Sequence, residues 1–473
     1  MRVKIVATLG PASMDRAVMK AMVEHGVRIF RLNFSHSDAA FFAPVVKLIR
    51  EVEAEAGVPI TIMGDLCGPK IRIGEVAGSP LTINKGCAVT LGPSDRRGQG
   101  EGCAYIALDK PELLKGLSQG MRVALSDGML QFVVTRVVEK DVLFTMEAQN
   151  SGILTSNKGI AFPGKHIAVA AVTDKDRRDL HGGLDIGMDA VALSFVQTAE
   201  DVLDLRREIE AHGAWIPIVA KIETQHAVEN LDAILEVSDA IMVARGDLGV
   251  EMSLAELPII QKRAIRAARH HQKAVIVATQ MLLSMVKNPV PTRAEATDVA
   301  NAILDGADCV MLSEETAVGA YPVETVRTMQ GIAENAEAYL LERQGGPFRP
   351  SEEKNIVKYL AYSACILADH IGAKAIVCHS TSGNTGRQIS SRRPCQAIYS
   401  LTTDERVLRA LNFFWGVKPR LAPADVPRHL ERVERFVRES PRFEPGEPVI
   451  LTAGQPSPGQ KIQHTNELKI YYK

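Results

Sequence analysis

The sequence predicts an α/β protein built around a (β/α)8 TIM barrel, with an inserted β-barrel-like lid domain and a C-terminal α/β domain. Eight short apolar runs recur along the chain, and polar residues follow each run. Amphipathic segments separate the later runs, and a region of a different pattern interrupts the series after the third. Continuous apolar strands that alternate with helices indicate a parallel sheet buried on both faces, and eight of them favour a closed barrel.

The eight predicted strands cover residues 4–10, 28–36, 60–68, 190–195, 216–223, 240–247, 274–280 and 309–315. Helices are predicted between the later strands, at residues 199–213, 253–272 and 292–307. In the first of these helices we expect Leu203, Leu205 and Ile209 on the buried side. In the last, Thr292 and Glu295 have the spacing of a capping box. No glycine fingerprint for a dinucleotide follows the first strand, which also disfavours an open sheet.

The interrupting region alternates apolar and polar residues and contains Asn-Lys-Gly and Asp-Gly turns, which predicts a small β domain inserted in a barrel loop. The predicted barrel therefore covers residues 1–69 and 171–344, and the β lid domain covers residues 70–170. A separate α/β unit is predicted over residues 345–473. It has a helix at 352–371 and strands at 373–380, 396–402, 447–454 and 467–472.

Composition excludes several classes of partner. The chain has 473 residues, 46% of them hydrophobic, and a net charge of −1, so it offers no electrostatic reason to bind nucleic acid or an anionic membrane. The seven cysteines are scattered without zinc-ligand spacing, and we expect buried free thiols. The N-terminal segment resembles a strand rather than a targeting signal, and no apolar run is long enough to span a bilayer. We therefore expect a cytoplasmic protein.

Polar residues gather where the predicted strands end, and the carboxyl ends of barrel strands meet at the rim that carries the active site. The second and third strands end in Arg31, Asn33, Ser35, His36, Asp65, Lys70 and Arg72. The later strands end in Lys221, Glu223, Arg245, Gly246, Asp247, Thr279 and Gln280. So many polar groups at one rim indicate a functional site.

Glu223 and Asp247 are candidate Mg²⁺ ligands, because they come from adjacent strands and Mg²⁺ takes oxygen ligands while keeping waters for a substrate phosphate. Lys221 lies two residues before Glu223, so both side chains point to the same face of the strand. The turn at Gly246 and Asp247 opens a helix whose amides suit an anion. Arg31 and Arg72 carry guanidinium forks suited to phosphate oxygens.

Each of these features also has a structural interpretation when it is taken alone. Lys221 and Glu223 suit a buried ion pair, and the glycines of the GDLG segment suit a simple turn. A strand-end threonine is usually structural, and single arginines commonly form surface ion pairs. Together, a metal, a lysine, two arginines and an anion pocket match what phosphoryl transfer needs. The chain has neither a Walker A motif nor a kinase glycine-rich loop, and the inserted domain would act as a lid that excludes water.

Long segments of the chain resemble pyruvate kinases. The similar segments are ATLGPAS, RIFRLNFSH, GDLCGPKIR, KGIAFPG, LSFVQTAEDV, AKIET, MVARGDLGVEM, ATQMLLSM and PTRAEATDVANAILDGADCVMLSEETAVGAYP. They follow in order over residues 3–330, and a weaker likeness continues to the C-terminus. The resemblance implies transfer of a phosphoryl group from phosphoenolpyruvate to ADP, which gives pyruvate and ATP. It also implies a homotetramer.

The resemblance assigns a role to each rim residue. Glu223 and Asp247 match the Mg²⁺ ligands, for which Mn²⁺ can substitute, and Lys221 matches the lysine that stabilises the phosphoryl group and the enolate. The substrate carboxylate pocket matches the amides of Gly246 and Asp247 with Thr279, which lies near the face where the enolate is protonated. Arg31 matches a substrate-phosphate contact, and Arg72, Asn33 and His36 match positions near the nucleotide phosphates. The monovalent-cation site matches Asn33, Ser35, Asp65 and the carbonyl of Leu66.

Lys70 departs from the pattern of relatives that need K⁺, which commonly have a glutamate there. A lysine ammonium supplies the positive charge that a bound K⁺ would provide, so we expect catalysis that does not require K⁺. Glu314 and Leu283 are two further departures, and neither stands at a position that carries chemistry in the family.

The C-terminal unit contains the segment HSTSGNTGRQIS, a Ser/Thr/Gly loop that enters a helix. Such a loop suits a phosphate, and it equally suits a simple N-cap. Relatives bind a phosphorylated allosteric effector here, so we expect Ser380, Ser382, Gly383 and Thr385 to contact the phosphate of a sugar phosphate or nucleotide monophosphate.

Two rival functions remain open from the residues. The first is a Mg²⁺-dependent lyase or mutase that acts on phosphoenolpyruvate or pyruvate in a similar barrel. Such an enzyme has no need for a lid or for Arg72 on the nucleotide side. The second is a degenerate barrel that serves as a metabolite sensor. It predicts the loss of Lys221, Glu223, Asp247 or Thr279, and all four are present.

Overall fold

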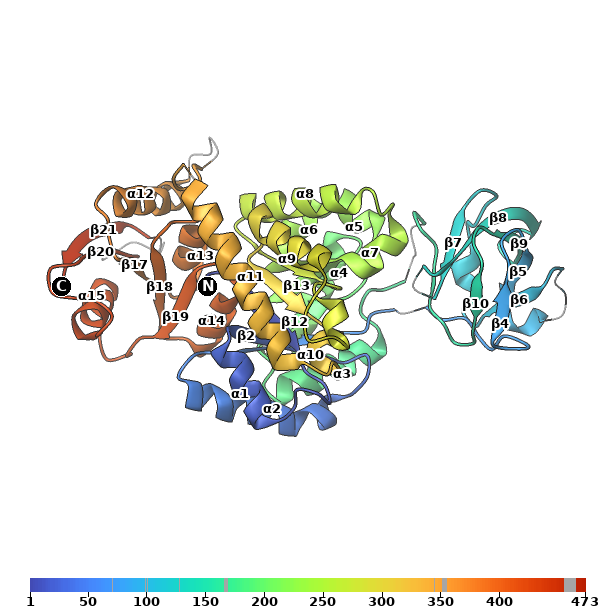
Figure 1. Cartoon of the computed structure of the whole chain (residues 1–473), viewed down its shortest axis with the longest axis horizontal. Helices are drawn as coiled ribbons and strands as arrows, with labels where there is room; N and C mark the ends of the chain where they lie inside the picture. The colour runs from blue at the N-terminus through green and yellow to red at the C-terminus, as the bar shows by residue number, and fades with distance from the viewer. Residues whose placement is uncertain are drawn as a thin grey trace.

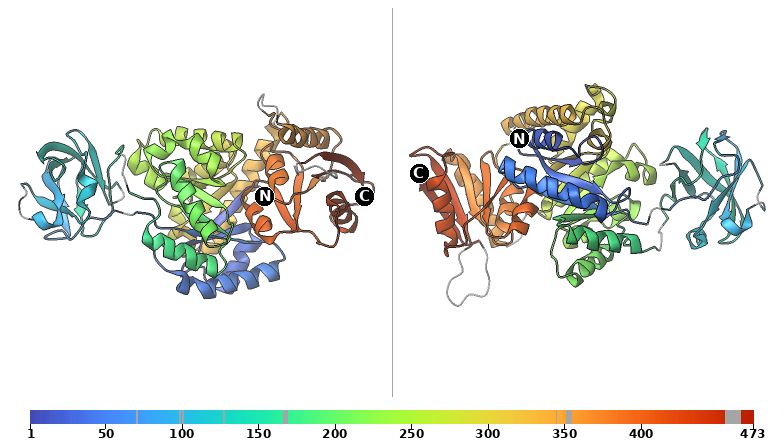
Figure 2. Two further views of the ribbon diagram at one scale, coloured as in Figure 1. Left: turned by 180° about the vertical axis from the view of Figure 1, so that it is seen from behind. Right: turned by 90° about the horizontal axis from the view of Figure 1, so that it is seen from below.

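The computed structural model describes residues 1–69, 71–97, 99, 101–126, 128–165, 169–343, 345–350, 355–454 and 465–473. Three parts lie in a row along the long axis (Figure 1). A closed barrel occupies the middle, a C-terminal α/β unit packs against one side of it, and the β strands of residues 81–161 stand apart on the other side. The views from behind and from below show the same order (Figure 2).

The barrel contains eight parallel strands, as predicted. They close in the order β1-β16-β15-β14-β13-β12-β3-β2. Their bounds are β1 (Lys4–Thr8), β2 (Val27–Asn33), β3 (Thr61–Asp65), β12 (Ala190–Leu193), β13 (Ile218–Ile222), β14 (Ala240–Ala244), β15 (Ala274–Ala278) and β16 (Cys309–Leu312). On β15, Ile276 belongs to one buried cluster, while its neighbours Val275 and Val277 belong to another. Both faces of the strand are therefore buried away from solvent, which explains the continuous apolar runs.

Helices surround the barrel (Figure 1). They are α1 (Arg16–Glu24), α2 (Ala39–Ala56), α3 (Asp174–Asp185), α4 (Ala199–Ala211), α5 (Gln225–Glu229), α6 (Leu231–Val237), α7 (Arg245–Glu251), α8 (Leu257–His270), α9 (Arg293–Asp305), α10 (Glu314–Ala317) and α11 (Pro322–Arg343). The capping box of α9 is confirmed, since Glu295 N donates to Thr292 Oγ1 and Thr292 N donates to Glu295 Oε2. The buried face of α4 is Val202, Leu205 and Ile209, so the prediction for Leu203 was wrong by one position. Spacings of three and four residues define one helix face, and Leu203 falls beside it.

The inserted strands form two sheets. A six-stranded sheet has the order β11-β7-β8-β9-β5-β6, and β10 pairs with β4. The bounds are β4 (Leu81–Ile83), β5 (Ala88–Pro93), β6 (Ala104–Leu108), β7 (Arg122–Leu125), β8 (Leu130–Glu139), β9 (Leu143–Ala148), β10 (Gly152–Leu154) and β11 (Ile160–Ala161). These sheets enclose a hydrophobic cluster of their own, which includes Phe132 and Phe144.

One cysteine prediction was wrong. Cys87 and Cys103 form a disulfide, because they precede the adjacent parallel strands β5 and β6. Sequence spacing does not reveal this pairing. Of the free cysteines, Cys309, Cys365 and Cys378 are buried as expected, and burial raises the pKa of each thiol. Cys67 is half-buried and Cys395 is exposed, so the expectation was wrong for these two as well.

The C-terminal unit is a five-stranded sheet with the order β19-β18-β17-β20-β21, covered by helices on both faces. Its elements are α12 (Ile356–His370), β17 (Ala375–His379), α13 (Asn384–Ser390), β18 (Ala397–Thr402), α14 (Glu405–Ala410), β19 (Val417–Leu421), α15 (His429–Glu439), β20 (Pro448–Ala453) and β21 (Glu467–Tyr472). The sequence prediction omitted β19 and α15. In the part of the chain that the structure describes, no helix combines the length and the apolar character that crossing a membrane requires.

Candidate active site

Lys221 lies at the centre of the barrel rim. Its Nζ is 2.8 Å from Glu223 Oε1 and 3.2 Å from Asp65 Oδ1, and it donates to Ser194 Oγ at 2.8 Å. Burial alone would lower the pKa of Lys221, but the carboxylates of Asp65 and Glu223 outweigh burial and raise that pKa. The ammonium group is therefore charged at any physiological pH.

Asp65 joins Lys221 to Arg31. Arg31 Nε donates to Asp65 Oδ2 at 2.6 Å, and Arg31 Nη1 donates to Thr8 Oγ1 at 3.1 Å. Burial would raise the pKa of Asp65, but the two cations Arg31 and Lys221 overcome that effect and lower it. The carboxylate therefore stays ionised and fixes both cations at the ends of β2 and β13.

Glu223 has the properties of a metal ligand. Its side chain is 1% exposed, and Phe195 N donates to its Oε2 at 2.8 Å. The other oxygen, Oε1, is buried and has the ammonium group of Lys221 2.8 Å away. Burial, together with repulsion from Asp247, raises the pKa of Glu223 even though Lys221 opposes the shift.

Two neighbouring carboxylates, one of them buried and raised in pKa, fit a divalent cation, whose charge would offset the burial of Glu223. A set of three or more His, Cys, Asp or Glu side chains placed to hold a metal is not found among the described residues. A metal held by Glu223 and Asp247 would therefore take its remaining ligands from water and substrate, as Mg²⁺ commonly does.

Thr279 is held in a strained backbone conformation beside α7. Its φ is 71° and that of Gln280 is 54°, both in the left-handed region that residues with a side chain rarely adopt. Arg245 stabilises this turn. Its Nη2 donates to Thr279 O at 2.7 Å, and its Nη1 forms an ion pair with Asp298 at 2.7 Å. Gly246 N donates to Thr279 Oγ1 at 2.9 Å, so the predicted carboxylate pocket is closed by an internal hydrogen bond here.

The other predicted rim residues are spread more widely. Asn33 Oδ1 accepts a hydrogen bond from Ser35 N at 3.1 Å, and Leu66 O accepts one from Ser194 Oγ at 2.6 Å. Ser35 and His36 are exposed. Arg72 lies on the segment that enters the inserted sheets, where its Nη1 donates to Asn157 O at 3.0 Å. Lys70 lies outside the described residues.

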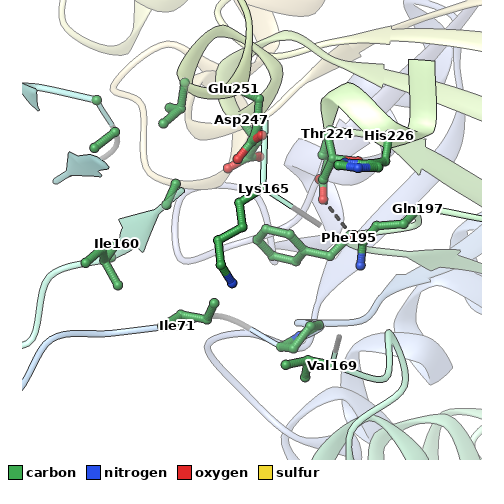
Figure 3. A pocket seen from close by; sticks show the side chains of 17 residues that line it. Ile71, Ile160, Lys165, Val169, Phe195, Gln197, Thr224, His226, Asp247 and Glu251 are labelled. Carbon is green, nitrogen blue, oxygen red and sulfur yellow. Dashed lines mark hydrogen bonds between the residues drawn. The ribbon is translucent and has the colours of Figure 1, made fainter. Parts of the chain in front are cut away.

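A cleft of about 860 Å³ separates the rim from the inserted sheets. Glu223 is one of its lining residues. Asp247 lies on its barrel side, and Ile71 and Ile160 lie on its other side (Figure 3). Lys165 extends into the middle of the view near the ring of Phe195. The position of the cleft puts a candidate metal site directly under the inserted domain.

Sequence reasoning missed Ser194 and the function of Arg245. Ser194 follows β12, so the strand-end rule that selected Lys221 would also have selected it. The sequence placed Arg245 at the end of β14. Its hydrogen bond to Thr279 O, however, depends on the pairing of β14 with β15. Lys165 and Glu251 also line the cleft, and no sequence pattern marks them.

The predicted effector loop lies in the C-terminal unit. Ser380 and Thr385 are buried, and their hydroxyl groups are engaged: Thr385 N donates to Ser380 Oγ, and Thr385 Oγ1 shares a hydrogen bond with Thr465 Oγ1. Ser382 is exposed, and Gly383 has a φ of 79° that suits a glycine. Of the four residues, Ser382 is thus the one whose side chain is open to a ligand.

Comparison with known proteins identifies the family. The family model described as "Pyruvate kinase, barrel domain" matches residues 1–326, and the model "Pyruvate kinase, alpha/beta domain" matches residues 358–471. The chain belongs to the pyruvate kinase family. The first match spans the barrel together with the inserted sheets, and the second spans the C-terminal sheet.

Similar proteins cover the whole chain. A pyruvate kinase of Agrobacterium vitis is 41% identical over 476 residues, which span 99% of this chain and 96% of the relative. A pyruvate kinase of Mycobacterium intracellulare is 38% identical, with 99% and 98% covered. A crystal structure of a pyruvate kinase from Cryptosporidium parvum superposes with a TM-score of 0.89 at 32% identity, covering 100% of this chain and 96% of that one.

Proposed function

We propose that this chain transfers the phosphoryl group of phosphoenolpyruvate to ADP at the rim around Lys221, with Mg²⁺ held by Glu223 and Asp247. The observation that carries this assignment is the pairing of buried Glu223 with exposed Asp247 beside a permanently charged lysine, at the base of the cleft. Mg²⁺, or Mn²⁺ in its place, would neutralise phosphate charge in that position.

The chain's own groups have separate tasks in this proposal. Lys221 and Arg31 present fixed positive charge to the phosphoryl oxygens, and Asp65 holds both cations so that they need not reorganise during the reaction. Lys221 also stabilises the negative charge of the enolate that remains after transfer. Gly246, Asp247 and Thr279 orient the substrate carboxylate. To bind it, Gly246 N would give up its hydrogen bond to Thr279 Oγ1 and donate to the carboxylate instead.

On the nucleotide side we assign Arg72, Asn33 and His36 to the ADP phosphates. The strained turn at Thr279 supports a role for its hydroxyl near the enolate, because strain of this kind is kept at sites where it serves a function. The inserted domain closes over the cleft to exclude water from the transferred group.

A coupled assay tests the reaction. We expect ATP to form from phosphoenolpyruvate and ADP only when Mg²⁺ or Mn²⁺ is present. Consumption of phosphoenolpyruvate or pyruvate without ADP and without ATP formation would favour a lyase or mutase, and a protein that binds phosphoenolpyruvate without turning it over would favour a sensor. Either result would overturn the proposal.

We propose that catalysis does not require K⁺, because Lys70 carries the positive charge of the monovalent-cation site formed by Asn33, Ser35, Asp65 and Leu66. Wild-type activity should be unchanged when a bulky organic cation replaces K⁺. Lys70→Glu should create a K⁺ requirement, measured as the activity ratio with and without K⁺, and Lys47→Glu on the exposed face of α2 serves as the charge-matched control. Strong activation of the wild type by K⁺ would contradict this assignment.

We propose an allosteric phosphate site at Ser380, Ser382, Gly383 and Thr385. Because Ser382 is exposed there, a carboxylate at that position should repel a phosphate. A panel of sugar phosphates and nucleotide monophosphates should therefore activate the wild type but not Ser382→Asp, whereas Ser382→Ala should keep a weakened response. Full responses in Ser382→Asp would place the effector elsewhere. A cytoplasmic location and a homotetramer remain predictions.

A further inference from the structure

Lys165 lines the candidate active cleft, and the reaction proposed above gives it no task. It follows β11 on the connection that returns from the inserted sheets to the barrel at α3. Figure 3 shows its side chain in the middle of the cleft, beside the ring of Phe195, with Ile160 on its other side. A lysine in this position meets any ligand that enters between the inserted sheets and the rim.

The connection that carries Lys165 lies against the one that carries Arg72. Arg72 and Gly159 form an antiparallel bridge, and Gly159 directly precedes β11. Arg72 is the residue that we assigned above to the ADP phosphates. Lys165 therefore belongs to the same, inserted side of the cleft as Arg72, whereas Lys221 and Arg31 belong to the barrel rim.

The ammonium group of Lys165 has no carboxylate partner among the described residues, although Glu223, Asp247 and Glu251 line the same cleft. In Figure 3 the side chain points away from Asp247 and Glu251. Its Nζ lies 5.7 Å from the centre of the Phe162 ring, a contact that orients the cation without neutralising it. Burial lowers the pKa of Lys165, and no nearby carboxylate offsets that effect. The cost of burying this charge is therefore left uncompensated until an anion enters.

The walls of the cleft strengthen the attraction of Lys165 for an anion. Many of the lining side chains are apolar, among them Ile71, Ile160, Val169, Phe195 and Val250. Apolar walls lower the local dielectric constant, which makes an interaction between charges stronger than it is in water. Of the described residues that line the cleft, Lys165 is the one with an amine or guanidinium group. It thus supplies the positive charge on the inserted side of the cleft.

We infer that Lys165 is a further substrate-binding residue, whose Nζ donates to a phosphate oxygen of bound ADP. The inference rests on the proposed function, since it takes ADP as the second substrate. A lysine ammonium binds phosphate as a point charge, so one such side chain is enough for the contact. The phosphate of phosphoenolpyruvate already has Lys221 and Arg31 at the rim, so the anion left for Lys165 is that of the nucleotide.

Titration calorimetry with ADP and Mg²⁺, in the absence of phosphoenolpyruvate, tests the inference. Lys165→Met keeps the stem of the side chain and should bind ADP about tenfold more weakly, because a charge-assisted hydrogen bond is worth at least that factor. Lys165→Arg retains the charge and should recover most of the affinity. Lys115→Met, at an exposed position of the inserted domain away from the cleft, is the charge-matched control and should bind like the wild type. Equal affinity of Lys165→Met and the wild type would overturn the inference, as would an equal loss of affinity for adenosine, which has no phosphate.

Steady-state kinetics give a second readout that a merely structural role would not produce. In Lys165→Met the KM for ADP should rise by about tenfold, while the KM for phosphoenolpyruvate should stay within about threefold of the wild-type value. A wild type that neither binds ADP nor forms ATP would overturn the proposed function and this inference together. If the wild type does both and Lys165→Met has the same KM for ADP, the assignment of Lys165 alone is overturned. A rise of both KM values by the same factor would likewise contradict a contact with the nucleotide.

Discussion

Replacing Lys221 with methionine should reduce kcat by about a thousandfold or more, because fixed charge at the reacting group is usually the largest catalytic contribution. The ammonium group contacts Asp65, Glu223 and Ser194 at once, so its position is tightly defined. Removing it also leaves two buried carboxylates less compensated, which should destabilise the fold by about 3–5 kcal/mol. The coupled assay measures the first effect, and chemical unfolding measures the second.

Two further variants separate these effects. Lys221→Arg retains the charge and should recover most of the stability, yet it should remain strongly impaired because a guanidinium group cannot take the same position. Lys47→Met, at an exposed position on α2, should match the wild type in both assays. If Lys221→Met retained more than about a tenth of wild-type kcat while folded, Lys221 would not be the catalytic cation assumed here.

Changing Glu223 to glutamine should raise the Mg²⁺ concentration needed for half-maximal activity by about a hundredfold, since substitutions even in the outer shell of a metal cost ten- to a hundredfold. The amide oxygen can still accept the hydrogen bond from Phe195 N, so the local fold should be retained. The charge and one metal ligand are lost, while the shape of the side chain is kept. Titrating activity against Mg²⁺ gives the measurement.

Glu251→Gln provides a matched control in the same cleft. Glu251 lines the cleft, and burial raises its pKa as it does for Glu223, but it accepts a hydrogen bond from Gly164 N. We expect its Mg²⁺ requirement to stay within about threefold of the wild type. Equal shifts in both variants would mean that the general charge of the cleft, rather than coordination by Glu223, sets the Mg²⁺ requirement.

Strand positions and the rim residues were accessible from the sequence because both follow local rules. A strand buried on both faces needs a continuous apolar run, and the carboxyl ends of parallel barrel strands meet at one rim. These rules correctly placed all eight barrel strands and brought Lys221 and Glu223 together. The same rules failed for Leu203, where the adjacent apolar residue Val202 left the helix face ambiguous, and for β19, whose run VKPRL is short and polar.

What the sequence by itself determined, then, is the barrel, the C-terminal α/β unit and the charged groups at the rim, because each depends on a period or on a strand end. Tertiary structure alone decided the hydrogen bond from Arg245 to Thr279 O, the pairing of Cys87 with Cys103, and the hydrogen bond from Lys4 Nζ to Val417 O. These contacts join residues from different strands, and some come from opposite ends of the chain. Their proximity depends on how whole elements pack, which no local pattern of residues records.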